Sequence, residues 1–320
     1  MAGGPVRASD GARDGSGASS DTARFTAAVD FVALNVTVTD EWHRFVTDLG
    51  ADDLAVYEDG VRQPLEFFTH ESLPVDLSIL IDASSSMESR FAAVKRAARG
   101  FVETLRPCDR AQVATFNSVV RVVQPFTSDP AALEQAIDSI RAGGLTALYT
   151  ALYVSLKEQT ADLRMRMTSG DLELRRRAIV VLSDGEDNGN ALGPKEVLDL
   201  ASRSDVAVYT ISLDRRLKKS DEDESREPTM DGFRAHDVWM REFAVRSGGL
   251  AFAPVLVADL AKIYGEIAAE LANQYCVAYR PRSPQGGVWH AIHVKVLRGG
   301  ATSRTRAGYF AGSSKGGLRR

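Results

Sequence analysis

Five side chains with oxygen donors stand where strands are predicted to end or in a glycine-containing loop, and their types suit a hard metal ion. These residues are Asp82, Ser84, Ser86, Thr146 and Asp184. Carboxylate and hydroxyl oxygens are ligands that Mg²⁺ accepts, with about six oxygens around the ion. Two carboxylates leave such an ion positive enough to attract a further carboxylate from another molecule. The set therefore predicts a divalent-cation site.

Two buried strands and one loop are expected to bring these side chains together. The apolar run Val75–Asp82 leads into Ser84 and Ser86, and the run Ala178–Ser183 leads into Asp184. Thr146 ends the loop that starts with Gly143-Gly144, before a helical segment. Open parallel sheets bind ligands beyond the carboxyl ends of their strands. The three segments are therefore expected to meet at one edge of a sheet.

The middle of the chain alternates predicted strands with predicted helices, which favours parallel pairing with helices on both faces of a sheet. The predicted helices cover 91–105, 131–140, 146–157, 194–204, 238–246 and 260–271, and further strands cover 110–117, 119–126 and 206–213. This pattern predicts an α/β fold with a doubly wound, mostly parallel sheet.

Both ends of the chain are predicted to be β. Residues 29–39 alternate apolar and polar side chains, and Asp59-Gly60 is typical of a tight hairpin turn. Three further strands are expected at 275–281, 288–297 and 303–310. We therefore expect a small split antiparallel β domain into which the α/β domain is inserted. The expected boundaries are 1–24 for a disordered N-terminal segment, 25–72 and 274–311 for the two parts of the β domain, 73–273 for the α/β domain, and 312–320 for a disordered tail.

Composition excludes several classes of protein. The chain has 320 residues, 44% of them hydrophobic, and a net charge of −4, so a large core is expected and nucleic acid is not the expected partner. No apolar run is long enough for a transmembrane segment. Two cysteines and five scattered histidines argue against a cysteine-rich or histidine-rich zinc site. The first residues lack the apolar middle region of a signal peptide, so they leave the compartment open.

The order Asp-x-Ser-x-Ser, then Gly-Gly-x-Thr, then Ser-Asp-Gly resembles the metal-ion-dependent adhesion site of von Willebrand factor A domains. The flanks, Ala51–Gly60 and the segment from Gln274 to Phe310, resemble a bacterial, acidobacterial-type subfamily of these domains. The resemblance implies a non-enzymatic module for adhesion or complex assembly. It also suggests a secreted or cell-envelope protein.

The same resemblance implies a role for each candidate ligand. Ser84 and Ser86 would bind Mg²⁺ directly, with Mn²⁺ or Ca²⁺ as other possible ions. Thr146 would bind directly or through water, and Asp82 and Asp184 would act mainly through water and hydrogen bonds. A Glu or Asp of a protein partner would complete the metal's coordination.

Other interpretations of the same residues stay open. The serines could cap a helix, Thr146 could be an N-cap and Asp184-Gly185 could be a simple turn. The domain could then be a structural scaffold without functional metal binding. A metal-dependent phosphoryl-transfer enzyme is less favoured, because such a site would want an Asp two residues after Asp82, where this chain has Ser84. The Gly143-Gly144 loop lacks the Lys-Ser/Thr of a nucleotide-binding loop.

Several residues outside this set receive mainly structural interpretations. Glu186, Asp187 and Asn188 are expected in a solvated loop, and the alternative is that they add to the metal shell. The segment 215–227, which changes from basic to acidic, is expected to be a surface loop or a partner-docking element. His290 and His293 lie on opposite faces of a strand and cannot share a metal. Cys108 and Cys276 are expected to be two separate buried thiols, and the alternative is a disulfide that joins the two domains.

Overall fold

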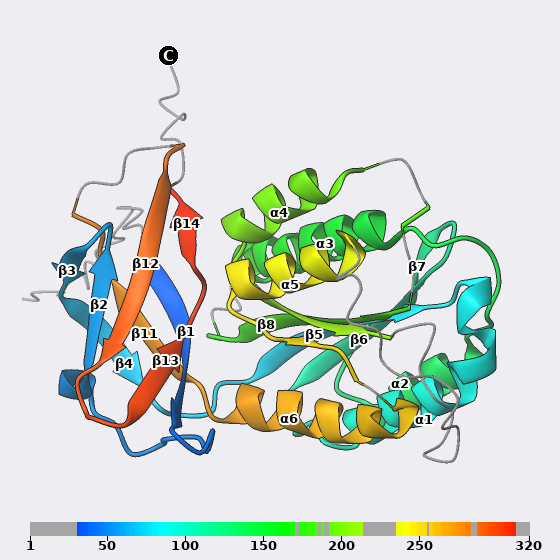
Figure 1. Cartoon of the computed structure of the whole chain (residues 1–320), viewed down its shortest axis with the longest axis horizontal. Helices are drawn as coiled ribbons and strands as arrows, with labels where there is room; N and C mark the ends of the chain where they lie inside the picture. Colours follow the sequence, from blue (N-terminus) through cyan, green and yellow to red (C-terminus); the bar gives the residue numbers. More distant parts are fainter. Residues whose placement is uncertain are drawn as a thin grey trace, which may run out of the picture. The chain divides into compact units, whose positions relative to one another are not determined.

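A six-stranded sheet forms the centre of the α/β part of the computed structural model (Figure 1). The structure describes residues 31–169, 173–184, 187–188, 192–213, 235–254, 256–282 and 287–311. The sheet order is β10-β9-β8-β5-β6-β7, and all neighbours are parallel except β6 and β7. Its strands are β5 (Val75–Asp82), β6 (Arg110–Phe116), β7 (Val120–Thr127), β8 (Arg176–Ser183), β9 (Val206–Ser212) and β10 (Ala251–Phe252).

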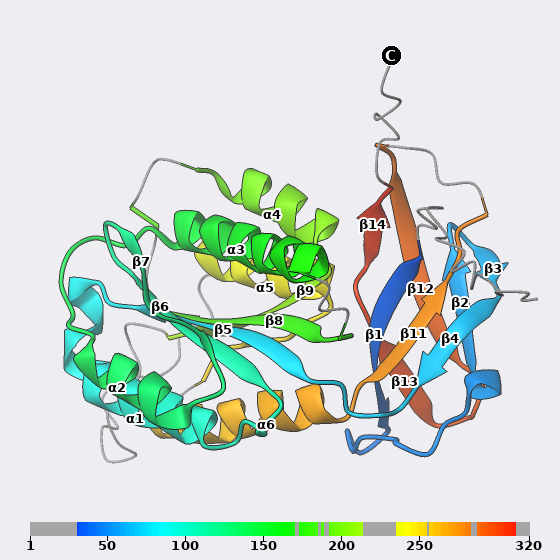
Figure 2. The same ribbon diagram turned by 180° about the vertical axis from the view of Figure 1, so that it is seen from behind.

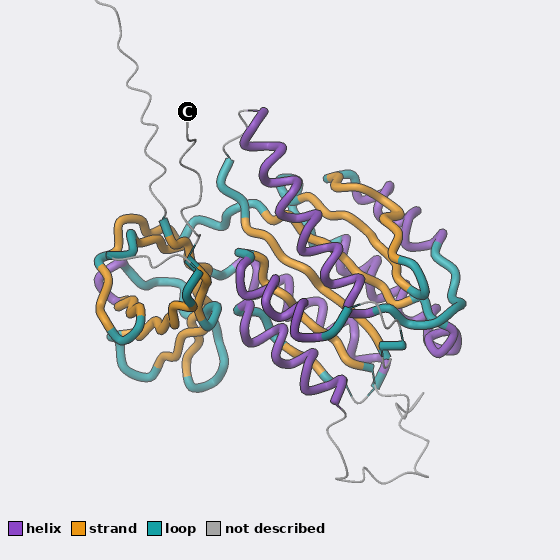
Figure 3. The backbone as a smooth tube through the Cα atoms, turned by 90° about the horizontal axis from the view of Figure 1, so that it is seen from above, coloured by secondary structure: helices purple, strands orange, loops and turns teal. Residues whose placement is uncertain are grey.

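Helices cover both faces of this sheet, as the view from behind also shows (Figure 2). One face packs on α1 (Phe91–Val102), α2 (Pro130–Ser139) and α6 (Leu260–Ala272). The other face packs on α3 (Leu148–Ser169), α4 (Pro194–Arg203) and α5 (Ala235–Ser247). All eight residues of β5 are buried, because this strand lies between two others and under helices on both sides. The tube view shows the purple helices flanking the orange strands (Figure 3).

The strands at the two ends of the chain form two four-stranded antiparallel sheets, with the orders β13-β1-β11-β4 and β14-β12-β2-β3. The N-terminal strands are β1 (Val32–Asp40), β2 (Leu54–Glu58), β3 (Val61–Gln63) and β4 (Leu65–Thr69). The C-terminal strands are β11 (Tyr275–Tyr279), β12 (Trp289–Val296), β13 (Ala301–Arg304) and β14 (Gly308–Phe310). The two sheets share one apolar core.

The pairing of these strands joins residues that are far apart in the sequence. Strand β1 pairs with β11, and β2 pairs with β12. The predicted fold class, a mostly parallel α/β sheet inserted between the halves of an antiparallel β part, is confirmed. The exact domain boundaries stay a prediction, and the segments 1–24 and 312–320 lie outside the described residues. Short 3₁₀ turns at Ala51–Asp53, Ser85–Arg90 and Val257–Asp259 complete the described elements.

Two local expectations were wrong. The helix predicted to end at Lys157 runs to Ser169, because its second half buries Gln159 and Arg166 in place of an apolar stripe. Cys108 and Cys276 are two separate free thiols, as the favoured interpretation expected, and the alternative disulfide is not formed. Cys276 is buried as expected, but Cys108 is exposed in the turn between α1 and β6.

Candidate metal centre

Ser84, Ser86 and Asp184 form a chain of hydrogen bonds at the carboxyl ends of β5 and β8. The hydroxyl oxygens of Ser84 and Ser86 are 3.0 Å apart, and the Ser86 hydroxyl donates to Asp184 Oδ1 at 2.7 Å. Ser84 directly precedes the 3₁₀ turn Ser85–Arg90, which places Ser86 in its first turn. The two strands lie side by side in the sheet, so the turn after one meets the residue after the other.

Asp82 is fully buried next to this row of hydrogen-bonded side chains. Its Oδ1 accepts the main-chain N–H of Ser84 at 2.8 Å, and its Oδ2 accepts the hydroxyl of Ser183 at 2.6 Å. Burial raises the pKa of Asp82 to about 6 and the charge of Asp184 adds to the rise, although these hydrogen bonds lower it. Asp82 therefore orients the Ser84 turn, and a cation nearby would favour its ionised form.

The loop that carries Thr146 is hydrogen-bonded to the turn after β5, mainly through its own main chain. Gly143 N–H donates to Ala83 O at 2.7 Å, and Gly144 N–H donates to Ser85 Oγ at 3.0 Å. Gly144 has φ +92°, which a residue with a side chain rarely adopts, and a Cβ there would lie 3.1 Å from Ser118 Oγ. The glycines that the sequence placed before Thr146 thus let this loop lie against the Ser84 turn.

Thr146 itself is buried, and its carbonyl accepts the N–H of Asn188 at 2.8 Å. No hydrogen bond among the described residues joins its hydroxyl to the other four candidate side chains. The structure thus brings four of the predicted residues into one network, and connects Thr146 to it through neighbouring main chain. The assignment of all five as metal ligands stays a prediction.

Arg90 is a member of this network that the sequence analysis missed. Its Nη1 lies 3.2 Å from Asp184 Oδ2, and the two side chains are 9% and 0% exposed. The residue comes from the end of the 3₁₀ turn after Ser84. An arginine eight positions after Asp82 has no spacing that indicates a contact across the sheet to Asp184, so sequence reasoning alone could not find it.

Asp187 was expected in a solvated loop, but its side chain accepts a hydrogen bond at the N-terminus of α3. Its Oδ2 accepts the N–H of Tyr149 at 2.7 Å, at the first turn of the helix. A carboxylate at this position satisfies an unpaired N–H and interacts favourably with the helix dipole. Glu186 lies outside the described residues, and so does the segment 215–227.

The donor set and its spacing fit a hard divalent cation. Two oxygen ligands at right angles around an ion with bonds of ~2.1 Å are about 3.0 Å apart. Ser84 Oγ and Ser86 Oγ have this separation, and Asp184 Oδ1 is close to Ser86 Oγ. The donors of the cluster are oxygens, which favours Mg²⁺ or a similar ion over a soft metal.

A second group of possible ligands lies in the antiparallel sheets, where Glu58, Asp59 and His290 meet. His290 Nδ1 is 2.8 Å from Asp59 Oδ2 and 3.7 Å from Glu58 Oε1. Asp59 Oδ1 accepts the N–H of Ala291, so this carboxylate joins the β2–β3 turn to β12. These contacts agree with the structural role expected for His290, which is buried while His293 is exposed.

Residues 76–231 match the family model of the von Willebrand factor type A domain. This chain contains a von Willebrand factor type A domain. The matched range includes the five candidate ligands and Arg90. The resemblance of the flanking segments to the acidobacterial-type subfamily stays a prediction.

Two curated relatives match nearly half of the chain. An uncharacterised protein of Borreliella burgdorferi is 27% identical over 154 residues, which cover 45% of this chain and 42% of that protein. An uncharacterised protein of Synechocystis sp. is 28% identical over 148 residues, which cover 44% of this chain and 32% of that protein. The matched stretch thus spans less than half the length of either relative.

Solved structures with similar folds include three examples with low sequence identity. A von Willebrand factor type A protein from Catenulispora acidiphila has a TM-score of 0.48 at 13% identity, covering 91% of this chain and 76% of that chain. Proximal thread matrix protein 1 from the mussel byssus, with a zinc-occupied adhesion-site motif, has a TM-score of 0.47 at 18% identity. The match covers 66% of this chain and 48% of that chain. An aerotolerance-related membrane protein from Bacteroides fragilis has a TM-score of 0.46 at 20% identity. The match covers 62% of this chain and 98% of that chain.

None of the described helices of this chain is both long and apolar enough to span a membrane.

Proposed function

We propose that this domain is a non-enzymatic, Mg²⁺-dependent protein-binding module. The supporting observation is the separation of 3.0 Å between Ser84 Oγ and Ser86 Oγ, with Asp184 Oδ1 at 2.7 Å from Ser86. These oxygens are placed as neighbouring ligands of one small cation would be. Ser84, Ser86 and Thr146 would bind the ion, and Asp82 and Asp184 would orient them and balance its charge.

The charge at the site supports a carboxylate as the partner's ligand. Arg90 already neutralises part of the charge of Asp184, so a bound divalent ion would keep a net positive charge. Such an ion attracts a Glu or Asp side chain of another protein. Catalysis of phosphoryl transfer is not proposed, because Ser84 replaces the second carboxylate that would serve as general acid.

A metal-free scaffold is the second candidate, and the Arg90–Asp184 ion pair is the observation that favours it. The guanidinium lies at Asp184 Oδ2 and competes electrostatically with a cation. In that case the polar network would serve only to hold three loops together.

Capture from an extract of the native organism tests the proposed binding function. The wild-type chain should retain a partner in Mg²⁺ and release it in EDTA, and Asp82→Asn should retain none in either buffer. Ser212→Ala is the matched control, because its hydroxyl lies at the end of the neighbouring β9 and donates to Asp237 instead of to the cluster. Retention that is equal in Mg²⁺ and EDTA would contradict the proposal.

A further inference from the structure

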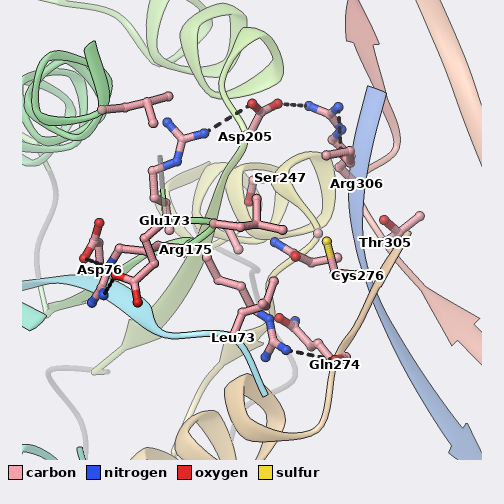
Figure 4. A pocket seen from close by; sticks show the side chains of 18 of the residues that line it. Leu73, Asp76, Glu173, Arg175, Asp205, Ser247, Gln274, Cys276, Thr305 and Arg306 are labelled. Atoms are coloured by element: carbon pink, nitrogen blue, oxygen red, sulfur yellow. Dashed lines mark hydrogen bonds and ion pairs between the residues drawn. The ribbon is translucent and has the colours of Figure 1, made fainter. Parts of the chain in front are cut away.

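A cavity of about 310 Å³ lies between the amino ends of β5 and β8 and the strands at the two ends of the chain (Figure 4). It is at the opposite end of β8 from the candidate metal centre, since β8 begins with Arg176 and ends with Ser183. A volume of this size is at the lower end of the range for small-molecule sites, about 300–1,000 Å³. The argument rests on Arg176, Gln274, Thr305 and Arg306, which all line this cavity.

Arg176 is a buried cation whose hydrogen bonds go to uncharged groups. It is 2% exposed, and it donates from Nη1 to the carbonyl of Leu271 and from Nη2 to the carbonyls of Glu71 and Gln274. Its Nε has no hydrogen-bond partner among the described residues. Burial is the largest cause of the lowered pKa of Arg176, and the charge of Asp109 opposes the shift without cancelling it. A buried charge of this kind is costly unless an anion accompanies it.

Unsatisfied polar atoms are concentrated at this cavity. Nine buried side-chain atoms of the described residues lack a hydrogen-bond partner, and four of them belong to residues that line the cavity. These four are Arg176 Nε, Arg306 Nε, Thr305 Oγ1 and Gln274 Oε1. Three of the four can donate a hydrogen bond, and Gln274 Oε1 can accept one. Buried polar groups are normally paired, so such a group indicates a missing ligand or water.

The acidic residues of the wall are engaged by other arginines. Asp76 pairs with Arg110 and Arg175, and Asp205 pairs with Arg177 and Arg306. Figure 4 shows Asp205 joined in this way to Arg306. Glu173 pairs with Arg166 and Arg175. Among the described residues, the wall has five arginines and three carboxylates, so positive charge is in excess among them. Apolar side chains complete the wall, namely Ala33, Leu73, Leu163, Leu174 and Ala207.

We propose that this cavity binds a small organic oxyanion, a carboxylate or phosphate monoester on an apolar body, with its charged group against Arg176. The hydroxyl of Thr305 and Nε of Arg306 would donate to the same group, and the apolar wall would contact its body. The site does not depend on the metal centre, so it does not depend on the proposed protein-binding function.

Ligand titration followed by heat unfolding and calorimetry tests this proposal. The probes are benzoate and phenyl phosphate, with benzyl alcohol as the uncharged control, in a Tris chloride buffer. The full chain should bind benzoate, phenyl phosphate or both in a saturable manner, and the response to each identifies the carboxylate or phosphate class. Benzyl alcohol should produce no comparable shift.

Two variants locate the binding. Thr305→Val removes a hydroxyl that has no partner in the described part of the chain, so the fold should persist while affinity falls about tenfold, as for the loss of a hydrogen bond to a charged group. Arg176→Lys keeps the charge and removes Nε, and it should weaken binding further. The exposed Arg121→Gln and the metal-centre variant Ser84→Ala should bind like the wild type.

Several results would overturn the proposal. One is the absence of saturable binding of both anions. Another is a response to benzyl alcohol equal to that of the anions. A third is unchanged affinity in both Thr305→Val and Arg176→Lys.

Discussion

At the residue scale, the donor set of the candidate metal centre could be predicted from the sequence, but its electrostatic balance could not. Asp82 ends β5, while Ser84, Ser86 and Asp184 come shortly after strand ends, and strand ends can be predicted from runs of apolar residues. Arg90 reaches Asp184 from a different turn, and this contact depends on the three-dimensional path of Ser85–Arg90. The same holds for Asp187, whose role became evident only from its hydrogen bond to Tyr149.

Arg90→Gln tests whether a bound Mg²⁺ can replace the stabilisation that the Arg90–Asp184 ion pair gives to the fold. Removing the arginine leaves Asp184 buried without this partner, so the free energy of unfolding without metal should fall by about 3 kcal/mol. Mg²⁺ should recover much of this loss, because the cation replaces the lost positive charge. Urea unfolding with and without Mg²⁺ measures both effects, with the exposed Arg96→Gln on α1 as the control. A loss that Mg²⁺ does not reduce would favour the metal-free scaffold.

At the element scale, strands and helices with clear periodicity were predictable, and segments held by polar contacts were not. The buried strands β5 and β8 and the hairpin at Asp59-Gly60 follow from local sequence. The second half of α3 does not, because Gln159 is buried there and donates to the carbonyls of Asp76 and Ala178. Such a contact stabilises a helix without adding an apolar residue to its pattern.

The junction of α1, β5 and β6 depends on Asp109, and this dependence predicts a response to pH. Asp109 accepts hydrogen bonds from Val75 N at 2.9 Å and from Arg106 N at 2.9 Å. Burial alone would raise the pKa of Asp109, but the hydrogen bonds and charge of Arg106, with Val75, lower it below the usual 3.8. The stabilisation is thus fully present above the unfolded pKa and is lost as pH falls through the lower folded pKa.

Asp109→Asn should therefore reduce the free energy of unfolding by about 2 kcal/mol at pH 7, as for loss of hydrogen bonds to a charged group. The difference from the wild type should begin to shrink as the pH falls below about 4, because the unfolded wild type then takes up a proton at Asp109 before the folded state does. Urea unfolding at several pH values from 7 to 3 measures the difference. A difference that stays constant over this range would show that the charge of Asp109 does not contribute.

At the scale of the whole molecule, residues 31–311 belong to one compact unit in which the α/β part and the antiparallel sheets share buried polar contacts. Glu270 of α6 is 2% exposed, accepts the Tyr209 hydroxyl at 2.7 Å and pairs with Arg304 of β13. Thr37 of β1 donates to the same carboxylate at 3.3 Å. The sequence predicted that the ends pair, but a buried Glu in a helix gave no signal of this contact.

A truncation after Asn273 tests the dependence of the N-terminal strands on the C-terminal ones. It removes β11 and β12, the partners of β1 and β2, so the segment 31–70 should become sensitive to protease while the central strands β5, β6 and β8 stay protected. Truncation after Ala311 is the matched control, because it keeps all described strands. Equal protection of 31–70 in both truncated chains would contradict a shared antiparallel part.

The most direct test of the account is the effect of Mg²⁺ on heat unfolding of the wild type, Ser84→Ala and Ser212→Ala. A ligand that binds only the folded state stabilises it by about 2.7 kcal/mol at a hundredfold excess over Kd. The account predicts a saturating rise in Tm for the wild type and Ser212→Ala, and none for Ser84→Ala, which lacks one of the two hydroxyls 3.0 Å apart. Equal shifts in all three chains, or no shift in the wild type, would contradict it.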